Sequence, residues 1–383
     1  MSSPLSVLIT NARTGGGGEA RYVVSLADQL QKSGRRILIG CKSKSVLADR
    51  GRSAGVPVLD EYFFRGGLRP RAWRHDLALM RSVLLEEKPD IIHVNSSQDH
   101  WVAAVSNRLL GRPSCLVRTR HNTYLVGNSW PNRVLNRDWT DFQIIVCRYM
   151  QDRFAAQPMF DRQRLATVHN GVDAEFYRPD PVLRDEARAE FGYSNEDVVI
   201  GIAARLNPVK GHDLLFRAVG LLIKELPNLR LLVLGHGGSK DELATLARDL
   251  GIAHAVTFAG QREDMQRCVQ AFDIGAQPSL EETSSFSLKE QMAAEKPVVT
   301  SDFAACKEIV DDGVEGFTAP VGTVEPLADA IRRLAVDREM RLRMGRAGRA
   351  RVLREFSVQE FCRRTIEAYG KALEVHKMRR AVR

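Results

Sequence analysis

The sequence lacks any apolar run long enough to cross a membrane. Its best candidate, residues 198–204, is seven residues long, whereas a transmembrane helix needs roughly 20. The N-terminus has neither the basic stretch nor the long apolar segment of a signal peptide. The six cysteines are far apart and form no C-x-x-C pair, so neither a zinc site nor a disulfide framework is indicated. Glycine and proline are at ordinary levels, which excludes a collagen-like or disordered chain. We expect a cytoplasmic globular protein with buried, reduced thiols.

Charge is unevenly distributed along the 383 residues, a length that favours two domains. Residues 1–180 carry a net charge of +9, residues 181–330 carry −10, and residues 331–383 carry +10. Basic surface attracts nucleic acid, anionic lipid or phosphorylated small molecules. No RNA-binding signature or zinc finger is present, so we expect no nucleic-acid partner. An anionic membrane surface and a phosphorylated ligand stay open.

Strand-like and helix-like stretches alternate along the whole chain, on both sides of a polar stretch at residues 177–181. Such alternation is typical of parallel sheets flanked by helices. We predict an α/β protein of two Rossmann-like domains that face each other across a cleft, followed by an amphipathic helix from about Ser357 to Leu373. The predicted strands are Ser6–Thr10, Arg36–Cys41, Ile91–Asn95, Leu116–Arg120, Gln143–Cys147, Val198–Ala204, Arg230–Gly235, Val256–Gly260, Ile274–Pro278 and Pro297–Ser301.

Two loops that follow predicted strands have the composition of phosphate-binding segments. Ligands of open parallel sheets bind beyond the carboxyl ends of the strands. Residues 15–18 are four glycines before a helix, which lets backbone approach a ligand and presents free N–H groups to an anion. Arg205 and Lys210 follow the strand at 198–204, where two cations are able to clamp a diphosphate and stabilise a leaving group. The alternatives are a flexible loop and a solvated basic loop.

Two glutamates follow the predicted strand Ile274–Pro278. Glu282 lies in the loop, and Glu290 lies in a helix that we expect at about 287–294. Carboxylates accept hydrogen bonds from sugar or ribose hydroxyls, often two at once. Amides at the start of the helix are suited to an anion. The alternative is an acidic helix cap and an exposed helical glutamate.

His121 and the stretch Leu68–Glu87 each have two interpretations, one functional and one purely structural. His121 directly follows a predicted strand, where a histidine can donate to a substrate oxygen or carry a proton, although a structural role is more common. The stretch Leu68–Glu87 places apolar residues at near-helical spacing, with arginines between them. It is either a helix for an anionic membrane surface or, more commonly, one that packs on the core. Its apolar positions are Trp73, Leu77, Met80 and Leu84.

Taken together, these segments resemble the retaining glycosyltransferases of family 4, which have the GT-B fold. Glu282 and Glu290 stand where that family has two glutamates separated by seven residues, and Arg205 and Lys210 match its Arg-x-x-x-x-Lys. Residues 166–173 resemble the interdomain strand and its Asn-Gly-Val-Asp turn. The matches run from about residue 6 to residue 370.

The resemblance implies an enzyme that moves a sugar from a nucleotide-diphosphate donor to a hydroxyl of a glycan or lipid-linked acceptor, with retained anomeric configuration. The expected pathway is cell-envelope polysaccharide or lipopolysaccharide synthesis, at the inner face of the cell membrane or free in the cytoplasm. The resemblance also implies an acceptor-binding domain at 1–178, a sugar-nucleotide-binding domain at 179–356, and a helix and basic tail at 357–383 that cross back to the first domain. The sugar nucleotide is a co-substrate, and no metal or other cofactor is expected.

Roles are carried over by position. The resemblance gives the diphosphate to Arg205 and Lys210, the donor-sugar hydroxyls to Glu282 and the ribose hydroxyls to Glu290. It places His121 by the donor sugar near the transfer centre. The remaining donor-binding positions are Gly16, Gly17, Arg262 (through the backbone of its turn), Ser285, Phe286 and Ser287.

One departure leaves the donor sugar open. Family members commonly have Glu-Gly-Phe-Gly where this chain has Glu-Thr-Ser-Ser from Glu282 onward, and the missing glycines change how closely the backbone approaches the sugar. The alternative functions are a GT-B hydrolase or epimerase of sugar nucleotides, and a glycosidase with two carboxylates at the scissile bond. A basic nucleotide- or nucleic-acid-binding protein ranks lower, because it leaves the two glutamates unexplained.

Overall fold

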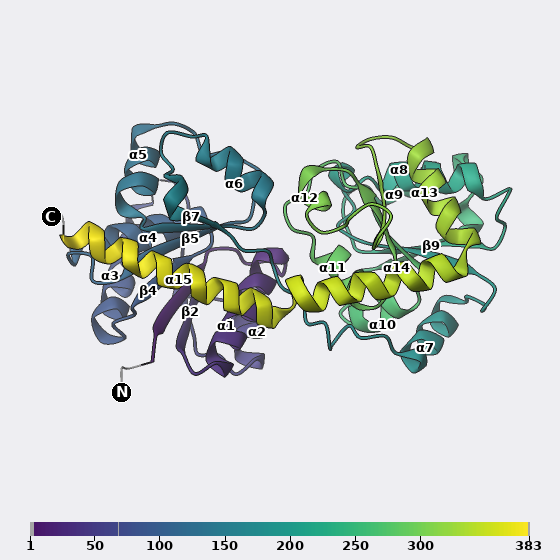
Figure 1. The fold of residues 1–383 in the computed structure, drawn as a ribbon. Coiled ribbons are helices and arrows are strands. Elements are labelled where there is room, and N and C mark those ends of the chain that lie inside the picture. The colour runs from purple at the N-terminus through teal and green to yellow at the C-terminus, as the bar shows by residue number, and fades with distance from the viewer. Residues whose placement is uncertain (1–3, 68, 382–383) are drawn as a thin grey trace. The chain divides into compact units, whose positions relative to one another are not determined.

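The computed structural model describes residues 4–67 and 69–381. Residues 1–3, Leu68 and residues 382–383, which belong to the predicted domain ranges and to the stretch Leu68–Glu87, lie outside the described residues. The chain divides into two compact units (Figure 1): unit 1 consists of residues 1–171 and 358–383, and unit 2 of residues 172–357.

Unit 1 is built on a parallel sheet of seven strands in the order β3-β2-β1-β4-β5-β6-β7. Helix α1 packs on α2, and α3 packs on α4, as expected when right-handed crossovers run in opposite directions from a central strand. Its elements are β1 (Ser6–Asn11), α1 (Gly18–Lys32), β2 (Arg36–Lys42), α2 (Val46–Ser53), β3 (Val58–Tyr62), α3 (Pro70–Glu86), β4 (Ile91–Val94), α4 (Ser97–Leu109), β5 (Cys115–Arg120), α5 (Trp130–Arg133), the π-helical turn η1 (Val134–Trp139), β6 (Phe142–Ile145), α6 (Arg148–Ala155), the 3-10 turn η2 (Arg162–Arg164), β7 (Leu165–Thr167) and α15 (Val358–Ala381).

Unit 2 is built on a parallel sheet of six strands in the order β10-β9-β8-β11-β12-β13. Its elements are α7 (Pro181–Phe191), β8 (Val198–Ala203), η3 (Pro208–Lys210), α8 (His212–Leu222), β9 (Leu229–Leu234), α9 (Lys240–Asp249), η4 (Ala253–Ala255), β10 (Val256–Gly260), α10 (Met265–Gln270), β11 (Ile274–Gln277), α11 (Phe286–Ala293), β12 (Val298–Ser301), α12 (Ala304–Lys307), β13 (Gly316–Ala319), α13 (Glu325–Val336), α14 (Arg338–Arg351) and η5 (Val352–Phe356).

Both faces of the unit 2 sheet are covered, and β8 shows why its sequence is continuously apolar. Successive strand side chains point to opposite faces. Val198, Ile200 and Ile202 belong to one hydrophobic cluster, while Val199 belongs to a second cluster. A strand buried on both sides has no position for a polar residue. The predicted pair of parallel, Rossmann-like sheets is therefore confirmed.

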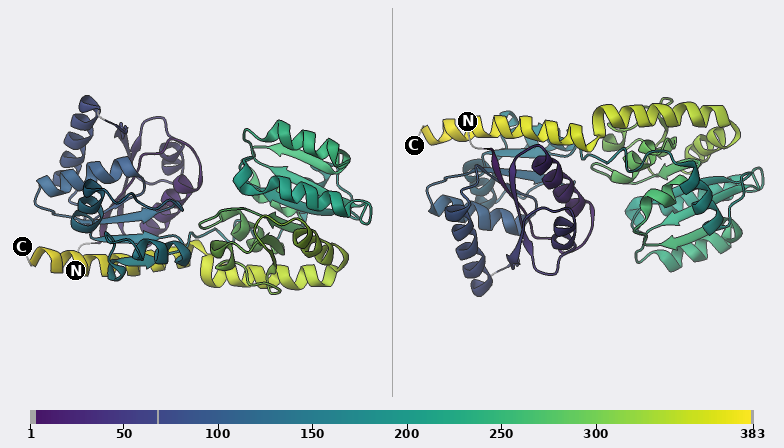
Figure 2. Two further views of the ribbon diagram at one scale, coloured as in Figure 1. Left: turned by 90° about the horizontal axis from the view of Figure 1, so that it is seen from above. Right: turned by 90° about the horizontal axis from the view of Figure 1, so that it is seen from below.

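Helix α15 belongs to unit 1, although the chain reaches it from unit 2. It packs against α1 and β5 and runs along unit 1 (Figure 2). It extends to Ala381, eight residues beyond the predicted end. The predicted return of the last helix to the first domain is confirmed.

The end of α15 is held by a buried carboxylate, Asp141. His376 Nδ1 lies 2.9 Å from Asp141 Oδ2, Arg379 Nη1 lies 3.3 Å from Oδ1, and Arg112 also pairs with Oδ1. Burial raises the pKa of Asp141, but its hydrogen bond to His376 and the charge of Arg112 together hold that pKa below its usual value. Cys115 is close enough to complete a three-ligand cluster with Asp141 and His376. Because the carboxylate oxygens are already bonded to His376, Arg379 and Arg112, the cluster is an anchor for α15.

Candidate active site

Each sheet has one point where the strand order reverses, and most of the predicted site residues follow the strands at these points; His121 and Arg262 instead follow β5 and β10. In unit 1 the reversal lies between β1 and β4, and in unit 2 between β8 and β11. Open α/β sheets bind ligands beyond the carboxyl ends of the strands at such a switch point. The loop after β8 carries Arg205 and Lys210, and the loop after β11 carries Glu282. Strand order, which the sequence does not display, makes these loops neighbours.

Lys210 and Glu282 form an ion pair. Lys210 Nζ lies 2.7 Å from Glu282 Oε2, and the two side chains are 17% and 11% exposed. Gln277, the last residue of β11, donates to the same carboxylate oxygen at 2.8 Å. The backbone N–H of Thr283 donates to Oε1 at 2.9 Å. Both oxygens of Glu282 are therefore fixed by donors from β8 and β11 loops and from the strand end.

The backbones of the two loops are in direct contact. The Leu280 N–H donates to the Val209 carbonyl at 2.8 Å. Gly211 has φ +67°, and a Cβ at this position would lie 2.1 Å from the Pro278 carbonyl oxygen. Only glycine combines this conformation with so close an approach. Gly211 therefore keeps Lys210 next to the loop of Glu282.

Ser285 links the start of α11 to the end of β11. It is the N-cap of α11, and its Oγ accepts from the Leu288 N–H at 3.2 Å. The same hydroxyl donates to Gln277 Oε1 at 2.7 Å. Gln277 thus orients both Glu282 and the start of α11. The sequence analysis missed Gln277, and the available signal was a polar residue ending an otherwise apolar strand, Ile-Gly-Ala-Gln.

The other predicted donor-site residues of α11 are distributed over the start of the helix. Phe286 is half-buried and packs against a core cluster of unit 2. Ser287 Oγ accepts from Gln291 Nε2 at 2.7 Å. Glu290 is 2% exposed, so it is not the exposed helical glutamate of the alternative interpretation. Lys289, beside it, is fully buried, donates to Ser284 Oγ at 2.7 Å and lies 5.0 Å from the Phe356 ring centroid.

Arg205 and Arg262 are in contrasting surroundings. Arg205 is exposed, and its side chain makes no ion pair with any residue the structure describes. The Arg262 side chain instead pairs with Glu190 at 2.9 Å and with Asp264 at 2.8 Å. Arg205 is available to an anionic ligand, whereas Arg262 has only the backbone of its turn to offer.

The glycine loop of unit 1 follows β1 and precedes α1. Neither Gly16 nor Gly17 has a positive φ. A Cβ at Gly17 would meet no described atom within 4 Å, while one at Gly16 would lie 3.0 Å from Val46 Cγ1. The fold of unit 1 therefore does not itself require glycine at position 17.

His121 directly follows β5 and contacts Asn95 and Tyr22. Its Nε2 lies 3.0 Å from Asn95 Oδ1. Asn95 Nδ2 donates to the Thr10 carbonyl at 3.1 Å, so His121 donates through Nε2. The ring packs edge-on against Tyr22 at a centroid distance of 4.7 Å. Burial, with smaller effects of Arg118 and His93, lowers the pKa of His121 well below its usual value, and the imidazole is neutral at neutral pH.

The apolar stripe of α3 packs on the core of unit 1. Met80 and Leu84 are buried, and Trp73 and Leu77 pack against the same cluster. Arg69, Arg71 and Arg74 are exposed. Of the two interpretations of this stretch, packing on the core is confirmed for its apolar residues. No helix within residues 4–67 or 69–381 has both the length and the apolarity that crossing a bilayer demands.

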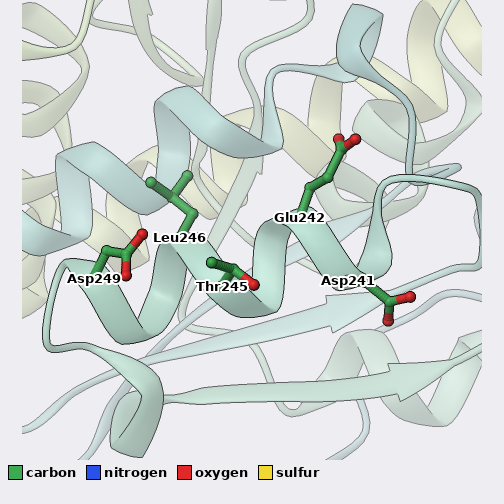
Figure 3. A pocket seen from close by; sticks show the side chains of 5 residues that line it. All are labelled: Asp241, Glu242, Thr245, Leu246 and Asp249. Atoms are coloured by element: carbon green, nitrogen blue, oxygen red, sulfur yellow. The ribbon is translucent and has the colours of Figure 1, made fainter.

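A separate concavity on unit 2 contains none of the predicted site residues (Figure 3). It is lined by residues of a single helix, α9: Asp241, Glu242, Thr245, Leu246 and Asp249. Because no second element contributes a side chain, its acidic groups do not converge on a ligand position, and we assign it no role.

Two family models match the chain. The model described as "Glycosyltransferase Family 4" matches residues 16–176, and that described as "Glycosyl transferases group 1" matches residues 184–351. The chain belongs to the family 4 glycosyltransferases. The family resemblance of its motifs is therefore confirmed, and residues 205–210 and 282–290 fall inside the second matched region.

A sequence relative and two solved structures illustrate the similarity. The chain is 33% identical to a D-inositol 3-phosphate glycosyltransferase of Mycobacteroides abscessus over 247 residues, which are 62% of this chain and 52% of that protein. The chain spans about half the length of such curated relatives.

The two solved structures cover nearly the whole chain. A glycosyltransferase from Rickettsia africae ESF-5 matches with a TM-score of 0.87 and 17% identity, covering 97% of this chain and 99% of that one. Anabaena HepE, solved with UDP and glucose, matches with a TM-score of 0.82 and 21% identity, covering 96% and 99%. The expected GT-B fold is confirmed.

Proposed function

We propose that this chain is a retaining glycosyltransferase that moves a sugar from a nucleotide-diphosphate donor to a hydroxyl of a glycan or lipid-linked acceptor of the cell envelope. The observation that carries the proposal is the Lys210–Glu282 ion pair at the switch point of unit 2. A cation for phosphate and a carboxylate for hydroxyls stand side by side there, with the exposed Arg205 on the same loop. A sugar nucleotide presents both kinds of group.

The chemistry follows from the charges. Lys210 has three N–H donors, so it can keep its bond to Glu282 while it donates to the diphosphate. Arg205 supplies a second, forked donor to the same group. Their positive charge stabilises the negative charge that grows on the leaving diphosphate as the glycosidic bond breaks. The departing diphosphate takes the proton of the acceptor hydroxyl, and the side chains need not form a covalent intermediate.

The remaining residues position the donor in this scheme. Glu282 accepts from sugar hydroxyls, and Glu290 accepts from ribose hydroxyls. The amides at Ser285, Phe286 and Ser287 face the donor sugar and phosphate from the start of α11, where free N–H groups favour an anion. Of the residues of unit 1, His121 lies beside the donor sugar in this scheme, and Gly16 and Gly17 approach the diphosphate. In unit 2, the turn at Arg262 meets the base through its backbone.

The first test is nucleotide binding followed by turnover. HepE was solved with UDP and glucose, so UDP is the first probe, followed by GDP and ADP. A nucleotide that binds only the folded protein raises its melting temperature. Arg205→Ala should abolish that shift and lower turnover by about 100-fold or more. Arg217→Ala, an exposed arginine on the neighbouring α8, is the matched control and should retain both.

Product analysis with and without acceptor separates the reactions. Sugar transfer only in the presence of an acceptor glycan supports the proposal. Release of free sugar or an epimerised donor at full rate without acceptor indicates the hydrolase or epimerase alternative. Unchanged turnover in Arg205→Ala points to chemistry that does not involve a diphosphate.

The acceptor side is proposed to work at an anionic membrane surface. Unit 1 has 32 lysines and arginines against 17 aspartates and glutamates, a net charge of +15, whereas unit 2 has 24 against 30, a net charge of −6. Anionic lipid attracts such a basic body, with roughly 1 kcal/mol per cation near the surface. Arg69, Arg71 and Arg74 are exposed at the start of α3, and they are the cations we expect at the lipid.

Vesicle binding tests this surface. Replacing Arg69, Arg71 and Arg74 with glutamine should weaken binding to phosphatidylglycerol-containing vesicles, with no change on phosphatidylcholine alone. The same charge change in unit 2, at the exposed Arg338, Arg343 and Arg346 of α14, is the control and should bind as the wild type does. Equal binding by both triple variants would remove the α3 arginines from the membrane contact.

A further inference from the structure

A buried chain of hydrogen bonds runs from α15 through the sheet of unit 1. The Tyr369 hydroxyl of α15 lies 2.7 Å from His93 Nδ1 on β4. His93 Nε2 lies 2.6 Å from Thr119 Oγ1 on β5. The same Thr119 hydroxyl lies 3.1 Å from the Tyr22 hydroxyl on α1. All four side chains are fully buried, so every link forms in surroundings that exclude water.

The chain ends against His121. The Tyr22 ring packs edge-on against the His121 ring at 4.7 Å with an interplanar angle of 78°. Thr119, two residues before His121 on the same strand end, holds the Tyr22 hydroxyl. The position of the Tyr22 ring, and through it one side of the His121 ring, therefore depends on the hydrogen bonds behind it.

The polarity of the chain is set by His93. Burial, with a smaller effect of Arg118, lowers the pKa of His93 to about 3, so the ring is neutral. A neutral imidazole donates through one nitrogen and accepts through the other. The hydroxyls of Tyr369 and Thr119 must therefore take opposite roles, and the loss of either leaves a buried nitrogen unpaired. An unpaired polar atom in the protein interior is unfavourable, so the loss of either hydroxyl favours a shift of the ring.

Helix α15 contacts this arrangement twice. Besides Tyr369, the Phe361 ring near the start of α15 packs against the Tyr22 ring at 4.9 Å. Phe361 and Tyr369 are eight residues apart on the buried face of the helix. The helix begins directly after the junction at which the chain returns from unit 2. The returning segment thus reaches Tyr22 directly through Phe361 and indirectly through Tyr369, His93 and Thr119.

We propose that α15 sets the orientation of His121 through the chain Tyr369–His93–Thr119–Tyr22, which makes Tyr369 a positioning residue for the transfer reaction. This inference rests on the proposed function, because it takes His121 to lie beside the donor sugar. Tyr369 itself touches no substrate. Its removal should therefore change the rate of the chemical step more than the binding of the nucleotide, whose proposed contacts lie mainly in unit 2.

The test compares two buried tyrosines of unit 1 that lose only a hydroxyl. Tyr369→Phe breaks the chain. Tyr62→Phe is the matched control, because the Tyr62 hydroxyl donates to Met80 Sδ at 3.7 Å and has no part in the chain. We expect Tyr369→Phe to lower kcat about tenfold or more with the KM for the donor unchanged, since a displacement of 1 Å in a reacting geometry can cost 100-fold. Tyr62→Phe should leave kcat unchanged.

Two further measurements separate positioning from stability. In samples with isotope-labelled histidine, the His121 ring signal is identified by its loss in His121→Gln, and it should shift in Tyr369→Phe and stay in place in Tyr62→Phe. Thr119→Ser keeps the hydroxyl and should retain kcat, whereas Thr119→Val should behave as Tyr369→Phe does. This pair decides the question even where Tyr369→Phe folds poorly.

The outcomes distinguish this inference from the proposed function. If His121→Gln has wild-type turnover, the role of His121 in the proposed function fails and the inference fails with it. If His121→Gln is inactive while Tyr369→Phe matches Tyr62→Phe in kcat and in the His121 signal, the proposed function stands and the inference is overturned. Equal rates in Thr119→Ser and Thr119→Val would overturn it as well.

Discussion

Mild acid should destabilise unit 1, and replacing His93 with glutamine should remove a defined part of that effect. His93 is fully buried and neutral between Tyr369 and Thr119. In the unfolded chain the ring has an ordinary pKa near 6.5, whereas burial lowers the pKa in the folded protein to about 3. Between these two values the unfolded state binds more protons than the folded state. Stability is therefore complete above pH 6.5 and is lost as the pH falls toward 3.

The size of the effect follows from this difference in pKa. Across the window, one titrating group changes the free energy of unfolding by about 1.4 kcal/mol per pH unit. Integrated from pH 7 to pH 5, His93 accounts for a loss of about 2 kcal/mol. The buried His100 and the half-buried His121 also have lowered pKa values, but they are present in both proteins. Their contributions cancel in the difference between wild type and variant.

The assay uses the placement of the tryptophans. All four belong to unit 1, so their fluorescence follows the unfolding of that unit alone: Trp73, Trp101, Trp130 and Trp139. Urea titrations at pH 7 and pH 5 give the free energy of unfolding of unit 1 for each protein. At pH 7 the variant should be less stable by about 1–3 kcal/mol, because hydroxyl partners of the ring are left poorly paired.

The decisive quantity is the pH dependence of the difference between the two proteins. The stability advantage of the wild type should shrink by about 2 kcal/mol between pH 7 and pH 5. A difference that stays constant would mean that His93 has the same pKa in both states. That result would refute the conclusion that His93 is buried and neutral, on which the chain Tyr369–His93–Thr119–Tyr22 depends.

Three other changes have expected outcomes. Burial and the charge of Arg184 lower the pKa of Lys296 from 10.5 to about 7. Between these values the unfolded chain binds more protons than the folded protein, so the stability of unit 2 should rise by about 2 kcal/mol from pH 7 to pH 9. Lys296→Met should abolish that rise in urea titrations followed by far-UV circular dichroism, and an unchanged rise would contradict the lowered pKa. Gly211→Ala forces a Cβ to 2.1 Å from the Pro278 carbonyl oxygen at φ +67°, so it should lower the melting temperature and the stabilisation by UDP; wild-type values for both would show that the loop yields. Asp141→Asn removes the carboxylate that pairs with the buried Arg112 and with Arg379 of α15, and it should lower the stability of unit 1 by about 3–5 kcal/mol in tryptophan fluorescence; a loss below about 1 kcal/mol would mean that the anchor is dispensable.

Core strands were predictable because burial on both faces leaves a local mark. β8 and β9 are apolar runs in the sequence, and the structure has them at Val198–Ala203 and Leu229–Leu234, inside the sheet. β3 and β13 were missed, and each lies at the edge of its sheet. β3 carries Asp60 and Glu61, because an edge strand borders solvent and needs no continuous apolar run. What a segment shows in sequence thus depends on how completely its neighbours cover it.

The candidate site was likewise predictable only in part. The sequence alone determined which residue types follow the strands, so Lys210 and Glu282 were identified from their spacing and chemistry. The sequence did not determine that Lys210 and Glu282 pair, since their ion pair requires β8 to lie beside β11. The role of Gln277 was not predicted, because its partners lie five and eight residues further along the chain, in the loop and at the start of the helix.

The tertiary structure alone decided the role of α15. Periodicity predicted a last amphipathic helix, but the identity of its partners depends on contacts between residues hundreds of positions apart, such as Tyr369 and His93. Hydrophobic pattern is a local property of the chain, whereas strand order and the docking of a returning helix arise only when distant segments are brought together. Composition and spacing therefore established which functional side chains this protein has, and the packing of remote segments decided which of those side chains contact one another.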